Sequence, residues 1–223
     1  MASVRRRALL ALCLLTGALL LTVPARAATP HDPILFVHGF SGSGSNWSTM
    51  ISRFRADGWT AAELNTISYS SLQSNETIAR QVRDRVNQIL AATGNAKVDL
   101  VTHSMGGLSS RWYVKFLGGD TRVDDWVSLG GPNHGTTTAG ACSLLVACRE
   151  MLPGSSFLQQ LNAGDETPGA VHYGTFWSPC DEIIIPQTST ILSGAQNTMT
   201  GCVGHISLLA DASVYQQVRE FVR

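Results

Sequence analysis

One short segment limits the fold of this chain more than any other. A serine stands between a strand-like run and a helix-like run, in the sequence Val101-Thr102-His103-Ser104-Met105-Gly106-Gly107. The residues before it, 97–101, have the character of a short buried strand, and residues 108–117 have helical spacing. A sharp strand-to-helix turn with small residues beside it exposes a side chain at the end of a sheet. We therefore expect Ser104 to lie at a reaction centre.

The rest of the chain alternates strand patterns with helix patterns of similar length. We expect strands at 33–37, 65–69, 97–101, 125–129 and 182–186, and helices at 46–59, from Ser74 to Gly94, and at 212–222. Such alternation predicts an α/β fold with a mostly parallel central sheet and helices on both faces. The segment 133–178 is the least predictable, and its apolar residues either pack in the core or form a wall of an acyl pocket.

The first 27 residues have the pattern of a secretory signal peptide. Arg5, Arg6 and Arg7 precede an apolar run, and Ala25-Arg26-Ala27 offers a cleavage site. We expect cleavage after Ala27 and a single secreted domain at 28–223, with an uncleaved anchor as the alternative. The run is short for a membrane span, so we expect no stable membrane insertion.

Charge argues against a nucleic-acid partner. The whole chain has 16 Lys and Arg against 16 Asp and Glu. The leader removes four arginines and no acid, which leaves 12 basic against 16 acidic residues and a formal charge of −4. A mildly acidic surface suits a soluble exported protein rather than one that binds nucleic acid, and we expect a monomer.

Four cysteines remain after cleavage, and four cysteines allow three pairings. Export favours disulfides, and short loop closure favours Cys142–Cys148 and Cys180–Cys202. A metal site is the alternative, but no C-x-x-C spacing supports it, so we expect no metal. Because Cys180 adjoins Asp181 and Cys202 precedes His205, the second disulfide would tie the loop of Asp181 to the loop of His205.

A serine hydroxyl becomes a nucleophile when a histidine takes its proton and an acid orients that histidine. In this architecture the chain order is Ser, acid, His. His205 is the only histidine that follows Asp181, so we assign Ser104 as nucleophile, Asp181 as orienting acid and His205 as base. The competing acids are Asp165, Glu166 and Glu182. We expect His134 to pack or hydrogen-bond near the site and His103 to support the turn at Ser104.

Backbone N–H groups should stabilise the oxyanion that forms during acyl transfer. One donor is the residue after the nucleophile, Met105, and the other lies in the loop after the first strand. We assign the second to Phe40, which follows His38-Gly39.

Four segments together resemble the small, lid-less triacylglycerol lipases that bacteria secrete, the class 2 lipases. They are 34–40, 97–107, 127–131 and 203–209, and they run through nearly the whole mature chain. The resemblance implies a minimal α/β-hydrolase fold and carboxylester hydrolysis. Its nucleophile, acid, base and oxyanion donors match Ser104, Asp181, His205, Phe40 and Met105.

The chain departs from that family at two places. Thr102 stands where the family usually has Ala or Gly, and its branched side chain is expected to crowd the turn. The segment 142–148 lies where the shortest members have little.

We therefore expect a cofactor-free serine hydrolase that acts on lipid or ester substrates, including those at an oil–water interface. The alternatives on the same fold are a short-chain esterase, a polyester hydrolase and a thioesterase. A binding protein without catalytic activity is a further alternative.

Overall fold

The computed structural model describes residues 29–222, so the expected signal peptide lies outside the described residues. The strands are β1 (Ile34–Val37), β2 (Leu64–Thr66), β3 (Val98–His103), β4 (Val123–Leu129), β5 (His172–Trp177) and β6 (Gln196–Met199). The α-helices are α1 (Ser48–Ala56), α2 (Asn75–Thr93), α3 (Met105–Phe116), α4 (Val146–Glu150), α5 (Ser156–Asn162) and α6 (Ala212–Phe221). Short 3₁₀ helices lie at Gly44–Trp47, Gly119–Thr121, Thr137–Cys142, Gln187–Thr190 and Ile206–Leu209.

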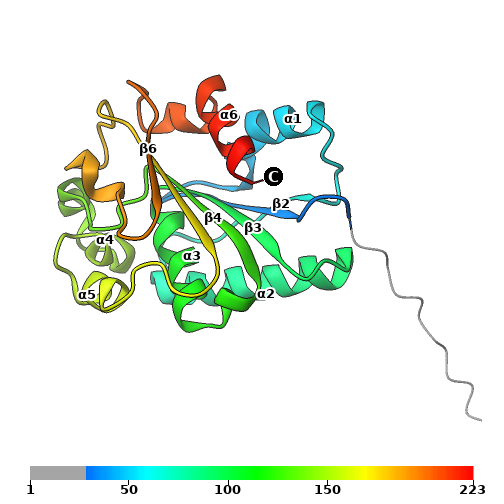
Figure 1. Ribbon diagram of the computed structural model, residues 1–223. Coiled ribbons are helices and arrows are strands. Elements are labelled where there is room, and N and C mark those ends of the chain that lie inside the picture. The colour runs from blue at the N-terminus through cyan, green and yellow to red at the C-terminus, as the bar shows by residue number, and fades with distance from the viewer. Residues whose placement is uncertain (1–28, 223) are drawn as a thin grey trace, which may run out of the picture.

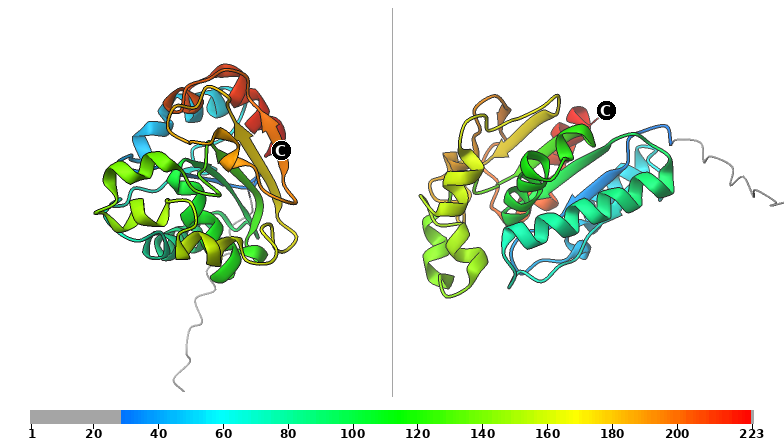
Figure 2. Two further views of the ribbon diagram at one scale, coloured as in Figure 1. Left: turned by 90° about the vertical axis from the view of Figure 1, so that its left-hand side faces the viewer. Right: turned by 90° about the horizontal axis from the view of Figure 1, so that it is seen from below.

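The six strands form one parallel sheet in the order β2-β1-β3-β4-β5-β6. Helices α2 and α3 cover one face, and α1 and α6 cover the other (Figures 1 and 2). The α/β class and the helix-covered parallel sheet expected from the sequence are therefore confirmed. Within residues 29–222, no helix has the length and apolar character needed to cross a bilayer.

Strand β1 shows why its sequence is apolar throughout. Leu35 and Val37 pack into the core layer beneath α2 and α3, whereas Ile34 and Phe36 pack into the layer beneath α1 and α6. All four side chains are fully buried. A parallel strand covered on both faces has no polar side to alternate with, so its residues form a continuous apolar run.

The expected helix boundaries depend on local capping. The Ser74 hydroxyl accepts the N–H of Thr77 and begins α2, and Gly94 ends it in the left-handed conformation with φ 79°. Helix α1 begins at Ser48 rather than at residue 46 because the chain first makes a 3₁₀ turn at Gly44–Trp47.

The strand expected at 182–186 is wrong, because that segment is a loop. Its backbone N–H groups bond to side chains instead of a neighbouring strand. Asp181 accepts the N–H groups of Ile183 and Ile184, and the Thr136 hydroxyl accepts that of Ile185. The sheet is completed by β5 and β6, which the sequence patterns did not identify.

The apolar residues of 133–178 pack mainly in the core. Phe157, Leu158 and Leu161 of α5 are buried, and the Phe157 ring stacks on Trp112 of α3 at 4.8 Å between centroids. These contacts support the expectation that the apolar residues of this segment pack in the core. Leu144, in contrast, is 94% exposed.

Helix α3 approaches β1 closely at Gly106. A Cβ atom there would lie 2.6 Å from the carbonyl oxygen of Val37 and 2.5 Å from that of His38. Both neighbours are backbone atoms of a buried strand end, so they cannot move aside cheaply. Glycine at this position lets the first turn of α3 lie against the end of β1.

We expect Gly106→Ala to lower the free energy of unfolding by about 1–3 kcal/mol because the added methyl overpacks this contact. Urea denaturation measures the loss. Gly140→Ala is the matched control, since a Cβ at that exposed glycine meets nothing within 4 Å. Equal stability of the two variants would contradict the prediction.

Candidate active site

Ser104 lies between β3 and α3 in a rare backbone conformation. Its φ is 54° and its ψ is −130°, a region that residues other than glycine seldom occupy. The Ser104 N–H donates to the carbonyl of Leu129 at the end of β4, 2.9 Å away. Gly39 lies against this turn so closely that a Cβ there would come within 2.7 Å of the Ser104 Cβ. These contacts hold the strained turn between two neighbouring strand ends.

Thr102 does not crowd the turn, contrary to our expectation. Its side chain is fully buried, and its hydroxyl donates to the carbonyl of Val127 on β4, 2.7 Å away. The branched side chain therefore has both space and a hydrogen-bond partner beside the neighbouring strand.

Asp181 and His205 form a buried pair. Asp181 Oδ2 lies 2.8 Å from His205 Nδ1, and the two side chains are 2% and 3% exposed. Burial alone would raise the pKa of Asp181, but hydrogen bonds from His205, Ile183 and Ile184 outweigh it and hold that pKa below its usual value. The carboxylate therefore stays ionised and accepts the Nδ1 proton, which leaves Nε2 as the nitrogen that can take a proton.

The competing acids have other partners. Glu166 accepts from His134 Nε2 at 2.7 Å and from the Ser193 N–H, and Asp165 accepts the Thr167 N–H. Glu182 accepts the backbone N–H of His205, a role that our sequence analysis did not anticipate. Of the four acids considered, Asp181 is the one that contacts the His205 ring.

Ser104 and His205 line the same pocket, which has a volume of about 280 Å³. Its walls come from 38–46, 103–104, 183 and 205–209. The segment 133–178 contributes none of these lining residues, so the alternative of an acyl-pocket wall there is not supported. Phe40 and the side chains of Ile183 and Ile206 give the pocket an apolar rim beside the serine.

Of the two expected oxyanion donors, one lines this pocket and the other directly follows Ser104. Phe40 is among its lining residues, in the loop after β1. Met105 is the first residue of α3, so its N–H has no acceptor within the helix. The loop after β1 is held by His38, whose Nδ1–H donates to the carbonyl of Gly39 at 2.8 Å and whose Nε2 accepts the N–H of Tyr69.

Both disulfides favoured by loop closure are present. Cys142 bonds to Cys148, and Cys180 bonds to Cys202. The second joins the loop after β5, which carries Asp181, to the loop after β6, which carries His205.

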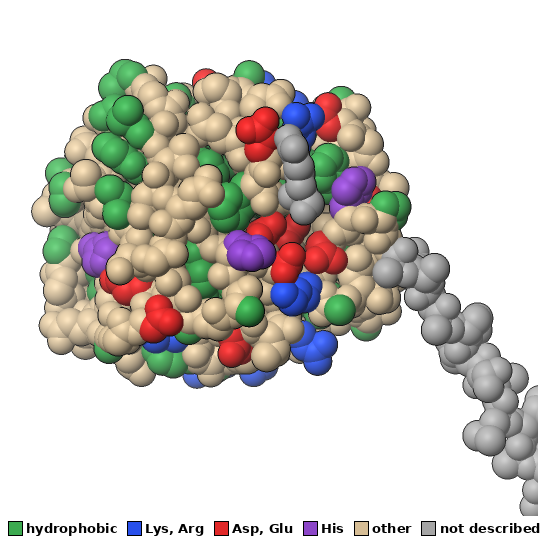
Figure 3. Space-filling model, in the orientation of Figure 1, with side chains coloured by type: hydrophobic (Ala, Val, Ile, Leu, Met, Phe, Trp, Pro, Cys, Tyr) green, Lys and Arg blue, Asp and Glu red, His purple; other side chains and the backbone are tan. Residues whose placement is uncertain are grey.

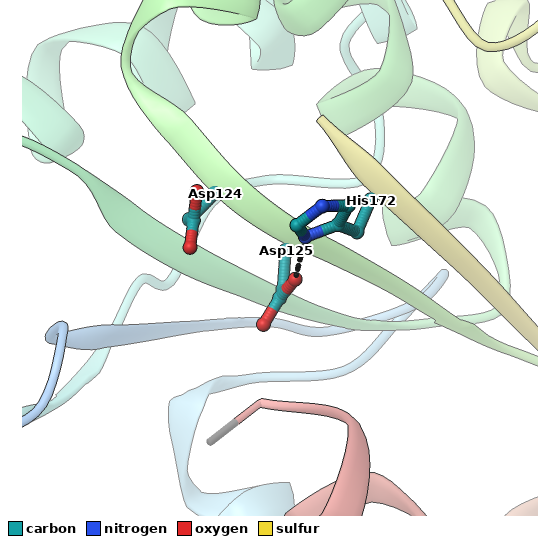
Figure 4. A group of neighbouring side chains, drawn as sticks. All are labelled: Asp124, Asp125 and His172. Carbon is teal, nitrogen blue, oxygen red and sulfur yellow. Dashed lines mark hydrogen bonds and ion pairs between the residues drawn. The ribbon is translucent and has the colours of Figure 1, made fainter. Parts of the chain in front are cut away.

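A second group of titratable side chains lies at the opposite end of the strands. Ligand atoms of Asp124, Asp125 and His172 lie within 4.8 Å of one another (Figure 4). Acidic side chains also gather beside a histidine on the face that Figure 3 shows. These residue types can bind a metal, but Lys97 pairs with Asp124 at 2.6 Å and His172 with Asp125 at 3.1 Å. Each of the two carboxylates therefore has a partner of opposite charge or a histidine beside it.

A bulge in β4 brings the two aspartates together. Val98 pairs with Val123 and Leu100 with Trp126, so Asp99 stands opposite both Asp124 and Asp125. Burial, with the charge of Asp124 nearby, raises the pKa of Asp125 to about 6 even though His172 lowers it in part.

Comparison with known proteins gives a consistent family. The family described as Lipase (class 2) matches residues 31–217. A triacylglycerol lipase of Pseudarthrobacter phenanthrenivorans is 32% identical over 119 residues, which are 51% of this chain and 36% of that protein. The chain thus aligns with about a third of the length of this curated relative.

Solved structures share the fold. The mature lipase BlEst2 of Bacillus licheniformis superposes with a TM-score of 0.75 at 19% identity, over 90% of this chain and 96% of that one. MGS-MChE2, an α/β hydrolase enzyme from a lagoon-sediment metagenome, has a TM-score of 0.63 at 18% identity, over 87% and 91%. The expected α/β-hydrolase fold is therefore confirmed.

We expect Asp125→Asn to be more stable than the wild type, by a larger margin at pH 8 than at pH 4. The pKa of Asp125 is about 6 in the folded protein and about 3.9 in an unfolded chain. The wild type therefore loses stability as pH rises from about 4 to about 6, a loss that the variant avoids because it cannot ionise. Asparagine keeps an oxygen that accepts from His172. Thermal unfolding of both proteins at the two pH values measures the difference, and a pH-independent difference in Tm would contradict it.

Proposed function

The chain belongs to the class 2 lipase family, and from this membership we propose that it is a serine hydrolase acting on carboxylic esters, with triacylglycerols as its substrate class. The observation that carries the proposal is the shared pocket of Ser104 and His205, with His205 Nδ1 held at 2.8 Å by Asp181. The triacylglycerol lipase that this chain resembles supports the substrate class.

The proposed reaction has two acyl-transfer steps. Ser104 Oγ attacks the ester carbonyl carbon while its proton passes to His205 Nε2. The N–H groups of Phe40 and Met105 stabilise the oxyanion, and Asp181 stabilises the protonated His205. The tetrahedral intermediate then breaks the bond to the alcohol, which leaves with the proton from His205. Water, activated by His205, hydrolyses the acyl-enzyme and restores Ser104.

The surroundings of the pocket support an apolar substrate. Ile183 is 41% exposed and Ile206 is 65% exposed, and both line the pocket. Exposed apolar side chains beside a reaction centre can contact the acyl chains of a lipid or an oil–water interface. We also propose that the protein is secreted, because two disulfides suit an oxidising compartment and residues 1–27 have the signal-peptide pattern.

We expect Ser104→Ala to abolish covalent labelling by a fluorophosphonate and to lower ester hydrolysis by at least about 10⁴-fold, because the variant has no nucleophile. Mass spectrometry of peptides from the labelled wild type should place the adduct on Ser104. Ser109→Ala serves as the control, because the Ser109 hydroxyl is buried in α3 outside the pocket and its loss should leave labelling unchanged. An unlabelled wild type would favour a binding protein without catalytic activity.

A short-chain esterase is a second candidate, favoured by the pocket volume. About 280 Å³ lies just below the range of about 300–1,000 Å³ typical of ligand pockets. Rates on p-nitrophenyl esters from acetate to palmitate, and on emulsified trioctanoin, separate the two candidates. We expect hydrolysis of the emulsion, because the exposed rim lets part of the acyl chain lie outside the pocket. Activity confined to soluble short esters would identify the protein as an esterase.

A further inference from the structure

The backbone of His205 is held on both sides, in addition to the contact at its ring. Its N–H donates to Glu182 Oε2 at 3.0 Å. Its carbonyl oxygen lies 3.0 Å from His103 Nε2. With Asp181 on Nδ1, three side chains fix this one residue through three different atoms.

Three consecutive residues hold the loop that carries His205. Cys180 is bonded to Cys202, Asp181 to the His205 ring, and Glu182 to the His205 N–H. Glycine at 204 keeps this approach open, since a Cβ there would come within 3.3 Å of Glu182 Oε2. Glu182 is itself exposed, so burial does not explain where its carboxylate lies.

His103 provides the opposite contact from the strand that leads to Ser104. Its side chain is buried, and its ring centroid lies 4.5 Å from that of His205. Burial, and then the charge of neighbouring His205, lower the pKa of His103 to about 3, so the ring is neutral at ordinary pH. A carbonyl oxygen only accepts, so the hydrogen of this neutral ring is on Nε2.

We propose that Glu182 and His103 are positioning residues that fix the backbone of His205, so that its ring is presented to Ser104. This inference rests on the proposed function, in which His205 is the base. Asp181 can direct Nε2 correctly only if the backbone from which the ring extends stays in place. A misplacement of about 1 Å can cost about 10²-fold in rate. Hydrogen bonds that hold the His205 backbone in place therefore affect the rate of the reaction.

The test on Glu182 compares loss of the acceptor with loss of the charge alone. On p-nitrophenyl butyrate, Glu182→Ala should lower kcat by about tenfold to a hundredfold with KM nearly unchanged, because the His205 N–H loses its acceptor. Glu182→Gln should restore most of the rate, since its amide oxygen still accepts. Glu166→Ala is the matched control, because Glu166 likewise accepts from a backbone N–H and contacts a histidine, but outside the pocket.

The test on His103 follows the same design. His103→Leu removes the donor and should lower kcat by a similar factor, whereas His103→Gln keeps a side-chain N–H and should recover part of it. Thermal unfolding of each variant shows whether the fold is retained. Recovery by glutamine at both positions, without a change in KM, is a result that a merely structural role would not produce.

The outcomes separate this inference from the proposed function. A wild type that is neither labelled by the fluorophosphonate nor active on the ester overturns both. A labelled, active wild type whose kcat is unchanged in Glu182→Ala and His103→Leu overturns the positioning roles alone. Glutamine variants as slow as Glu182→Ala and His103→Leu also overturn them, because the hydrogen bonds would then not carry the effect.

Discussion

The backbone conformation of Ser104 is the constraint on which the candidate site depends. A non-glycine residue with φ 54° and ψ −130° persists only where its surroundings determine it. Here the Leu129 carbonyl accepts its N–H, Gly39 lies against its Cβ, and Gly106 lets α3 begin directly over the end of β1. The parallel sheet thus supplies three strand ends, and small residues allow them to meet at the serine.

The same geometry decides where the other groups must come from. Loops that follow the carboxyl ends of parallel strands meet at one edge of a sheet, so residues distant in sequence become neighbours there. Asp181 follows β5 and His205 follows β6, and a disulfide and three hydrogen bonds fix the loops that carry them. These contacts restrain the loop that carries His205, the proposed base.

The sequence predicted those features that depend on local pattern. A continuous apolar run identified β1, strand-like runs before Ser104 and before Gly130 identified β3 and β4, and Ser74 and Gly94 marked the ends of α2. Chain order selected Asp181 and His205, which the structure brings together. The failures have a tertiary cause. The apolar run at 182–186 resembles a strand, but its N–H groups serve Asp181 and Thr136. Strand β6, by contrast, is largely exposed and polar, so no hydrophobic periodicity marks it.

Two Asp–His pairs in this chain show why residue type alone does not define a site. Asp181–His205 and Asp125–His172 have similar separations, 2.8 Å and 3.1 Å. The first acid is buried, but the hydrogen bond from His205 and two backbone N–H groups hold its pKa below the usual value. Its histidine is buried in a pocket with a serine. Burial, with the charge of Asp124 nearby, raises the pKa of the second acid, and its histidine is 73% exposed. The first pair lies in loops that follow the carboxyl ends of the strands, whereas Asp125 and His172 lie near the beginning of β4 and β5. Position along the parallel strands therefore separates the candidate catalytic pair from a second Asp–His contact.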